Sequence, residues 1–196
     1  MSEQLVYYVI SVTERGFTFG ARMPPESLPQ LGSLVKTRLD ERLALVGLIH
    51  RIEIQGNEIT RAMSVHAGLL DPAEIEYHRS RLVPVIVEAL SLGYLRCDGE
   101  VRAFHLPPPR LPVVLGEVHA LDADEMRCFT QESQPIFETI ATFLSDRMVE
   151  LASAMIARVA GDDRERRVQL CRALVLAWST QLDKADAVVR RIGGIA

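Results

Sequence analysis

The densest cluster of acid–base side chains in the sequence is formed by Glu74, Glu76 and His78. On a helix, Glu74 and His78 would share one face and could together bind a metal ion or transfer a proton. The simpler interpretation is that Glu74 completes the N-terminal cap of a helix starting at Asp71 and pairs with His78 at the surface. We favour the simpler interpretation and predict no metal ion and no cofactor. Glu74 and His78 remain the candidate metal ligands of an alternative function, a metal-dependent hydrolase.

Arg164, Arg166 and Arg167 are the best candidates for binding an anion, because a guanidinium group matches the geometry of phosphates and carboxylates. Acidic residues are interleaved with these arginines, which is more typical of a solvated helix face than of a phosphate-binding track. Aromatic residues make up only 6% of the chain and are not interleaved with the arginines. The stacking surface of proteins that bind single-stranded nucleic acid is therefore not visible.

Signatures of covalent or phosphoryl-transfer chemistry are not found in the sequence. There is no G-x-S-x-G motif, and neither Lys36 nor Lys184 stands in the G-x-x-x-x-G-K-[ST] motif of a phosphate-binding loop. Cys97, Cys128 and Cys171 stand in no nucleophile signature. We predict that the chain is not an enzyme and has no catalytic residue.

The composition is that of a globular protein. Of the 196 residues, 48% are hydrophobic and 24% charged, and the net charge of −4 is spread evenly along the chain. The apolar runs at residues 43–49 and 83–87 are much shorter than the roughly 20 residues of a membrane span, and the acidic N-terminus does not resemble a secretory signal. The widely spaced cysteines form no C-x-x-C pair, which indicates a reducing compartment. We predict a soluble cytoplasmic protein without membrane contact.

Residues 1–118 are predicted to form a small β-barrel. Residues 6–10 and 17–21 flank a turn at 14–16, which is typical of a hairpin. Further strands are expected at 34–39, 43–54, 101–106, 113–118 and, if it is not a helix, 83–95. Gly47 marks a bulge or barrel corner in the longest of them. Six or seven short strands with closely spaced turns indicate a barrel or a sandwich.

Residues 121–196 are predicted to be helical. A short helix is expected at 122–129, and Ser133 begins the next one, with a proline in its first turn. Apolar residues then step by three and four along two stretches that flank a break at 160–163. The second stretch is an uninterrupted heptad-like seam of Val168, Cys171, Val175, Trp178, Leu182, Ala185, Val189 and Ile192. Because the connection is short, the two long helices are expected to form an antiparallel hairpin.

Leu170, Leu174 and Leu176 lie off this seam. The second long helix therefore has more apolar surface than one partner helix covers, and the rest must meet the β-rich part or another subunit. Together with Trp178, these leucines are our candidates for an interface with a partner or with a second copy of the chain.

Glycine-containing motifs recur in the β-rich part: Leu31-Gly32-Ser33-Leu34-Val35, then Leu45-Val46-Gly47-Leu48-Ile49, and later Leu92-Gly93-Tyr94-Leu95 before the prolines at 107–109. In these motifs the chain resembles the HAS-barrel, a small β-barrel shared by HerA-type DNA translocases and the N-terminal domains of ATP synthase catalytic subunits. The resemblance covers roughly residues 4–120 and none of the helical part. It implies a stand-alone barrel without the ATPase core, used for assembly and partner docking rather than for catalysis.

We interpret the chain as an α+β protein, with a β-barrel over residues 1–118 and an α-helical hairpin over residues 121–196. Its expected function is that of a non-catalytic assembly or adaptor protein. The barrel would dock to a partner, for example a DNA-processing ATPase, and the helices would mediate homo-oligomerisation. The alternative is a nucleic-acid-binding accessory protein that uses a barrel face and the arginines of residues 164–167.

Overall fold

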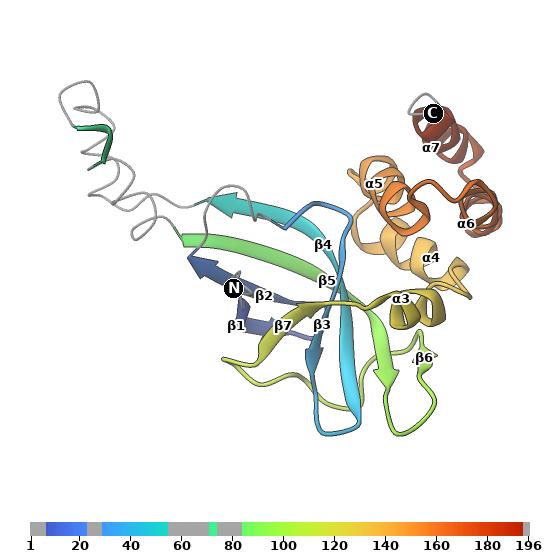
Figure 1. Cartoon of the computed structure of the whole chain (residues 1–196). Helices are drawn as coiled ribbons and strands as arrows, with labels where there is room; N and C mark the ends of the chain where they lie inside the picture. The colour runs from blue at the N-terminus through green and yellow to red at the C-terminus, as the bar shows by residue number, and fades with distance from the viewer. Residues whose placement is uncertain (1–6, 23–28, 55–70, 74–83, 194–196) are drawn as a thin grey trace.

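Seven β-strands lie in the part of the chain that the computed structural model describes, which comprises residues 7–22, 29–54, 71–73 and 84–193. They are β1 (Tyr7–Thr13), β2 (Gly16–Arg22), β3 (Leu34–Arg38), β4 (Leu43–Ile54), β5 (Pro84–Arg96), β6 (Arg102–Phe104) and β7 (Glu117–Ala120). Six of them close a barrel in the order β2-β1-β7-β3-β4-β5, because β5 pairs back onto β2. All pairs are antiparallel, and β6 joins the far end of β5 (Figure 1).

The barrel strands contribute to two separate cores. One core contains apolar residues from all six barrel strands and none from the helices, among them Val9, Phe19 and Val118, and it fills the inside of the barrel. The other core lies on the outside of β3, β4 and β5. Because successive side chains of a strand point to opposite faces, Leu34 packs towards the helices while its neighbour Val35 packs into the barrel. Burial on both faces explains why β4 is almost continuously apolar.

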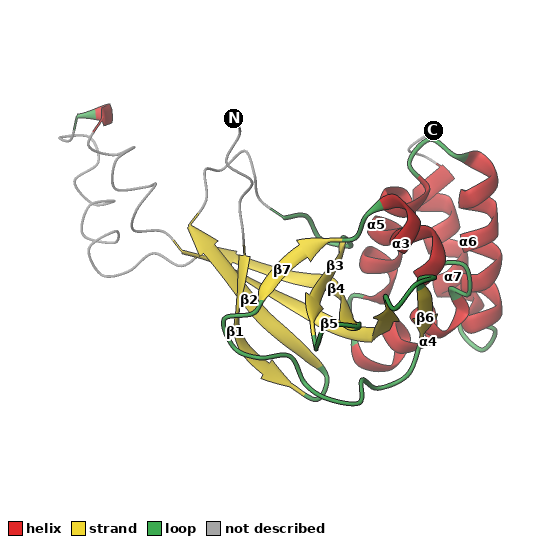
Figure 2. Cartoon of the chain, turned by 60° about the horizontal axis from the view of Figure 1, so that its bottom comes forward, coloured by secondary structure: helices red, strands yellow, loops and turns green. Residues whose placement is uncertain are grey.

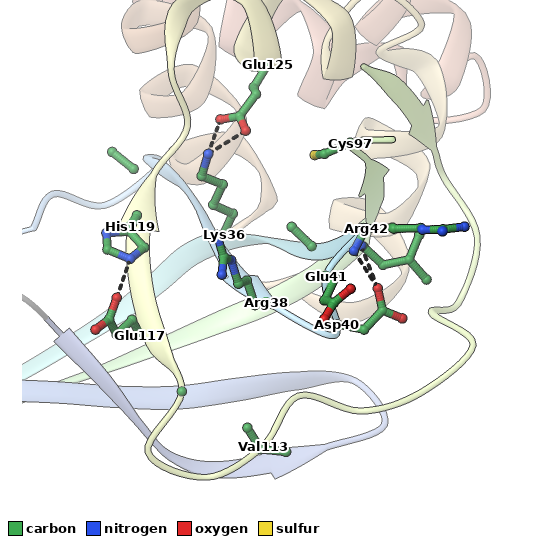
Figure 3. Close-up of a pocket in the computed structure, with 14 residues that line it drawn as sticks. Lys36, Arg38, Asp40, Glu41, Arg42, Cys97, Val113, Glu117, His119 and Glu125 are labelled. Carbon is green, nitrogen blue, oxygen red and sulfur yellow. Dashed lines mark hydrogen bonds and ion pairs between the residues drawn. The ribbon is translucent and has the colours of Figure 1, made fainter. Parts of the chain in front are cut away.

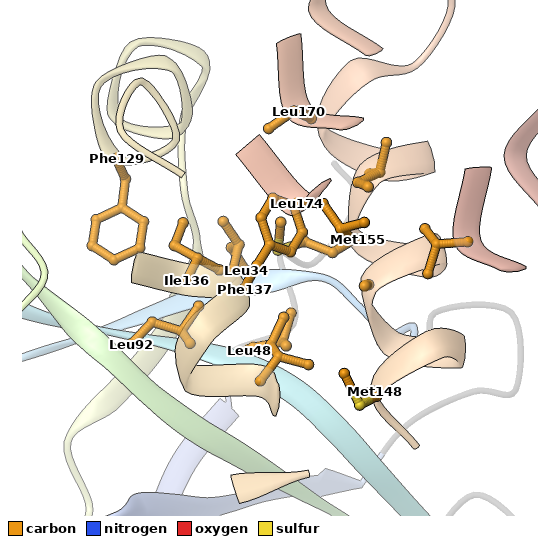
Figure 4. Packing of buried hydrophobic residues seen from close by; sticks show 14 of the residues in the cluster. Leu34, Leu48, Leu92, Phe129, Ile136, Phe137, Met148, Met155, Leu170 and Leu174 are labelled. Atoms are coloured by element: carbon orange, nitrogen blue, oxygen red, sulfur yellow. The ribbon is translucent and has the colours of Figure 1, made fainter. Parts of the chain in front are cut away.

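Five helices follow the strands in the described part of the chain and pack together on one side of the barrel (Figure 2). They are α3 (Ala123–Phe129), α4 (Gln134–Phe143), α5 (Met148–Ala160), α6 (Arg164–Ala177) and α7 (Leu182–Gly193). Leu48 and Leu92 of the outer barrel face join Phe137, Met155 and Leu174 of the helices in one continuous core (Figure 4). The predicted α+β class, a barrel followed by helices, is confirmed.

The two long helices expected from the sequence are each divided. α4 ends at Phe143 and α5 begins at Met148, while the seam at 168–192 is split between α6 and α7 by residues 178–181. Ser145 lies in the first break, and Ser179 and Thr180 lie in the second; side chains of these types compete for the backbone hydrogen bonds of a helix. The prediction of one uninterrupted seam was therefore wrong. α5 and α6 do pack on each other across the predicted break, but as two of five helices in the described part of the chain. None of the helices in the described ranges has the length and apolar character needed to cross a membrane.

The last predicted strand, at residues 113–118, begins later in the structure. Residues 113–116 form a tight turn in which the N–H of Gly116 donates to the carbonyl of Val113 at 3.1 Å. Leu115 has a φ of 66°, in the left-handed region that residues with a side chain seldom adopt. The turn leads directly into β7, which extends only over Glu117–Ala120.

Gly32 and Gly93 belong to the motifs that resemble the HAS-barrel, and each permits a close approach of another element. Their φ angles are 79° and 142°. A Cβ at Gly32 would lie 2.7 Å from the backbone nitrogen of Met155 in α5, and a Cβ at Gly93 would lie 2.1 Å from the carbonyl oxygen of Phe104 in β6. A side chain at either position would displace the neighbouring element.

Candidate functional site

A hollow of about 770 Å³ lies between the barrel and α3 (Figure 3). Strands β3 and β7, the turn that leads from β3 into β4, and α3 provide its lining. Charges of both signs gather there: the lining includes Lys36, Arg38, Asp40, Glu41, Arg42, Glu117 and Glu125, together with His119 and Cys97.

An ion pair between Lys36 and Glu125 joins β3 to α3 inside this hollow (Figure 3). Glu125 is almost buried, with 8% of its side chain exposed. Its Oε2 accepts the backbone N–H of Asp122 at 2.9 Å, while Asp122 Oδ1 accepts the backbone N–H of Glu125 at 2.9 Å. Glu125 thus closes a capping box at the start of α3 and holds the helix on the barrel. Both charges of the pair have a structural role.

Two of the remaining carboxylates around the hollow, Asp40 and Glu117, have partners within the chain. Asp40 accepts two backbone N–H groups in the turn before β4, at 2.8 and 2.9 Å, and pairs with Arg110 at 3.2 Å. The hydrogen bond from the N–H of Arg42 is the main cause that lowers the pKa of Asp40. His119 Nε2 lies 3.1 Å from Glu117 Oε2. Because its lining carries lysine and arginine side chains in nearly the same number as carboxylates, the hollow presents no large excess of one charge that would select a class of ligand.

Cys97 is the thiol of this hollow, and its surroundings do not activate it. Burial raises the pKa of the Cys97 thiol, and the negative charge of Glu125 raises it further. Because the thiolate is the reactive form, Cys97 is a poor nucleophile at neutral pH. Within the described residues, histidine, cysteine and carboxylate side chains form no group of three or more that could hold a metal ion.

The second concave surface is an apolar groove of about 850 Å³ between α6 and α7, which we call the α6–α7 groove. Val168, Cys171, Val175 and Leu176 of α6 and Val189 of α7 line it. The exposed fractions are 42% for Val168, 37% for Val175, 65% for Leu176 and 40% for Val189. Contiguous exposed apolar side chains of this kind mark interaction surfaces.

The apolar interface candidates from the sequence divide between the core and the surface. Leu170 and Leu174 are completely buried, and Trp178 is 1% exposed, with its indole N–H donating to the carbonyl of Phe137 at 2.9 Å. These three residues fill the core of the chain itself and are not accessible to a partner, which corrects their assignment to an interface. Leu176 alone of the four candidates lies on the surface, in the α6–α7 groove.

The three arginines proposed as an anion site do not converge. Arg166 turns towards α3, where it donates to Thr130 Oγ1 at 2.5 Å. Arg167 donates to the carbonyl of Gly161 at 2.6 Å, and Arg164 lies beside it on the rim of the groove. Since two of the three guanidinium groups bind within the chain, the cluster does not favour the nucleic-acid alternative. Glu74, Glu76 and His78, the candidate metal cluster, lie outside the described residues.

The sequence failed to show that Val168, Val175 and Val189 are accessible, because their spacing placed them on a buried seam. A competing signal was present: Leu170, Leu174 and Trp178 also recur at helical spacing on another face of the same segment.

Comparison of the chain with models of known protein families gives no match, and comparison with curated proteins gives none either.

Proposed function

We propose that this chain is a non-catalytic adaptor or assembly protein whose α6–α7 groove docks to another protein surface. The observation that carries the proposal is the contiguous apolar surface of the groove. Leu176 is its most exposed large apolar residue, with an exposed fraction of 65%. The opposite face of α6 is held in the core by Leu170 and Leu174. The helix therefore cannot turn its outer apolar residues inwards without exposing others.

The apolar surface of such a groove supplies part of the free energy needed for association. Burial of apolar surface contributes about 25 cal/mol per Å². A partner that covered about 300 Å² of apolar surface would gain about 7 kcal/mol before the entropic costs of association are subtracted. Covering the exposed valines and the leucine of the groove thus favours complex formation.

The barrel supplies a second proposed docking surface. We propose that it is a HAS-barrel and that it contacts a partner such as a DNA-processing ATPase, as the resemblance implies. The closed antiparallel barrel supports this assignment, and so do the close approaches at Gly32 and Gly93, which give two of the motif glycines a structural role.

Site-specific photo-crosslinking in the native cells tests the docking function. A photoreactive amino acid placed at Leu176 should give a crosslinked product, because this side chain lies in the groove. The matched control is Ala187, which is exposed on α7 but does not line the groove. Products of equal yield from both positions, or none from Leu176, would contradict the proposal. The mass of the product then distinguishes a second copy of the chain from another protein.

A further inference from the structure

We infer that the occupant of the α6–α7 groove is an amphipathic helix of another protein, in which acidic residues flank an apolar stripe. This inference rests on the proposed docking function and adds the chemistry of the partner. Three features of the groove carry it: its shape, the spacing of its apolar residues and the sign of its charges.

Shape and spacing favour a helix as the occupant. Val168, Cys171 and Val175 follow one another at intervals of three and four residues, which is the spacing of a coiled-coil seam. These residues line the groove from α6, and Val189 and Ile192 line it from α7. A channel between two neighbouring helices accommodates a third helix, whose residues at i, i+3, i+4 and i+7 then pack against the seam.

The charges of the groove favour acidic flanks on that helix. Among the described residues, the charged side chains that line the groove are Arg164, Arg167 and Arg172, all from α6. Glu165 does not line the groove; it lines an adjoining hollow that shares Arg164, Val168 and Arg172 with the groove. An apolar floor with a basic rim is complemented by an apolar stripe bordered by aspartate or glutamate.

A second copy of the chain fits the groove less well. In a two-fold dimer the same patch meets itself, so the three arginines of one copy would share the interface with those of the other. The lining offers no carboxylate to pair with them, and like charges brought together oppose association. A different protein with acidic flanks avoids this repulsion.

A pair of designed peptides tests the inference with the full chain. Both peptides have three heptads with leucine at the a and d positions; one has glutamate at e and g, the other lysine. Fluorescence anisotropy at low salt should show the glutamate peptide binding at least about tenfold more tightly, because its carboxylates complement the arginine rim. The preference should decrease as salt is added, since Arg164 and Arg172 of the rim are exposed.

Groove variants locate the binding. Leu176→Glu should weaken binding of the glutamate peptide at least about tenfold, because it places a carboxylate in the apolar floor. Arg172→Glu should reverse part of the preference and strengthen binding of the lysine peptide. Ala187→Glu is the matched control outside the groove and should leave both affinities unchanged. Circular dichroism and thermal unfolding verify that each variant is folded.

Several results would overturn the inference. They are the absence of binding to the folded wild type, equal affinity for the two peptides, and unchanged binding in Leu176→Glu. If light scattering shows a wild-type dimer and Leu176→Glu dissociates it, a second copy of the chain occupies the groove. The proposed docking function would then be supported, and the inference of an acidic helix would be rejected. Groove-dependent binding to vesicles of phosphatidylglycerol and phosphatidylcholine would identify a lipid surface as the occupant. It would reject both the docking of another protein and the inference of an acidic helix. If peptides, light scattering and crosslinking at Leu176 are all negative, docking itself fails.

Discussion

His105 occupies a position at which a single protonation event affects the stability of the fold. Its ring packs against the ring of Phe129 in α3, with centroids 4.6 Å apart. Burial lowers the pKa of His105, and the backbone at Leu92 and the negative charge of Glu132 only partly offset this effect. The neutral imidazole is therefore the form that the folded chain accommodates.

We predict that the chain loses stability as the pH falls below about 6.5, the ordinary pKa of histidine. Above this pH His105 is neutral in both the folded and the unfolded chain, so the free energy of unfolding does not depend on its protonation. Below this pH the unfolded chain binds the proton more readily than the folded chain, which lowers the free energy of unfolding. Burial also lowers the pKa of His50, and this shift likewise lowers the free energy of unfolding as the pH falls. Urea unfolding between about pH 7.5 and 5.5 measures the effect, because carboxylates titrate mostly below this window.

His105→Phe and His50→Gln separate the two contributions. Each variant should show a shallower decrease of the unfolding free energy with falling pH than the wild type, and the double variant should be nearly flat. The slopes are compared rather than the absolute stabilities, since either substitution changes packing as well. A slope in His105→Phe equal to that of the wild type would show that His105 does not contribute.

At the scale of a single element, the turn at residues 113–116 combines a strained backbone with exposed apolar residues. Leu115 is 74% exposed and has a φ of 66°. The left-handed conformation costs a residue with a side chain roughly 1–2 kcal/mol. The turn is held to β1, where the N–H of Leu115 donates to the carbonyl of Val9 at 2.8 Å. The exposed side chain gains little from packing to offset the strain.

Leu115→Gly should raise the free energy of unfolding by about 0.5–1 kcal/mol, because glycine adopts this conformation without strain. Val114→Gly is the matched control in the same turn. Val114 has no positive φ, so glycine there adds only flexibility to the unfolded chain and should lower stability by about 0.5–1 kcal/mol. Thermal and urea unfolding measure both. A loss of stability in Leu115→Gly similar to that of the control would refute the assignment of strain.

The helices show where periodicity alone is ambiguous. α6 has one apolar stripe through Leu170 and Leu174 and another through Val168 and Val175, and both have helical spacing. α6 packs on α4 and α5, and this contact buries the leucines. Helical periodicity shows which residues share a face, but not which face has a neighbour.

For the whole molecule, the barrel and the helices depend on one another. The outer barrel residues Leu48, Leu90 and Leu92 are at most 5% exposed and share one core with the helices. Removal of the helices would place these leucines in water, and each fully buried leucine contributes about 1.5–3 kcal/mol of burial free energy. The barrel is therefore not expected to be stable on its own.

A chain that ends at Leu121 should fail to give a monomer with a cooperative thermal transition. The same shortened chain with Leu48→Thr, Leu90→Thr and Leu92→Thr should recover solubility, because these side chains point out of the barrel. Replacement of inward-facing Val87 and Ile49 by threonine is the matched control and should not rescue it. Size-exclusion chromatography and thermal unfolding measure the result. A shortened wild-type barrel that is monomeric and unfolds cooperatively would contradict the shared-core dependence.

Elements with local causes could be predicted from the sequence. The apolar run at residues 43–54 and its turns predicted β4 with the bounds that the structure shows, and the capping pattern at Asp122 predicted the start of α3. Both depend on neighbours within a few residues, namely a nearly continuous apolar run bounded by turn residues and a side chain that accepts backbone N–H groups.

Contacts between residues that are distant in the sequence could not be predicted and follow from the folded arrangement. Lys36 and Glu125 are 89 positions apart, and their ion pair forms because β7 pairs with β3 and α3 follows β7 directly. The same holds for the α6–α7 groove, since Leu174 is buried and Val175 exposed only because α4 and α5 cover one side of α6. Burial depends on which surfaces meet in space, and a pattern along one helix does not contain that information.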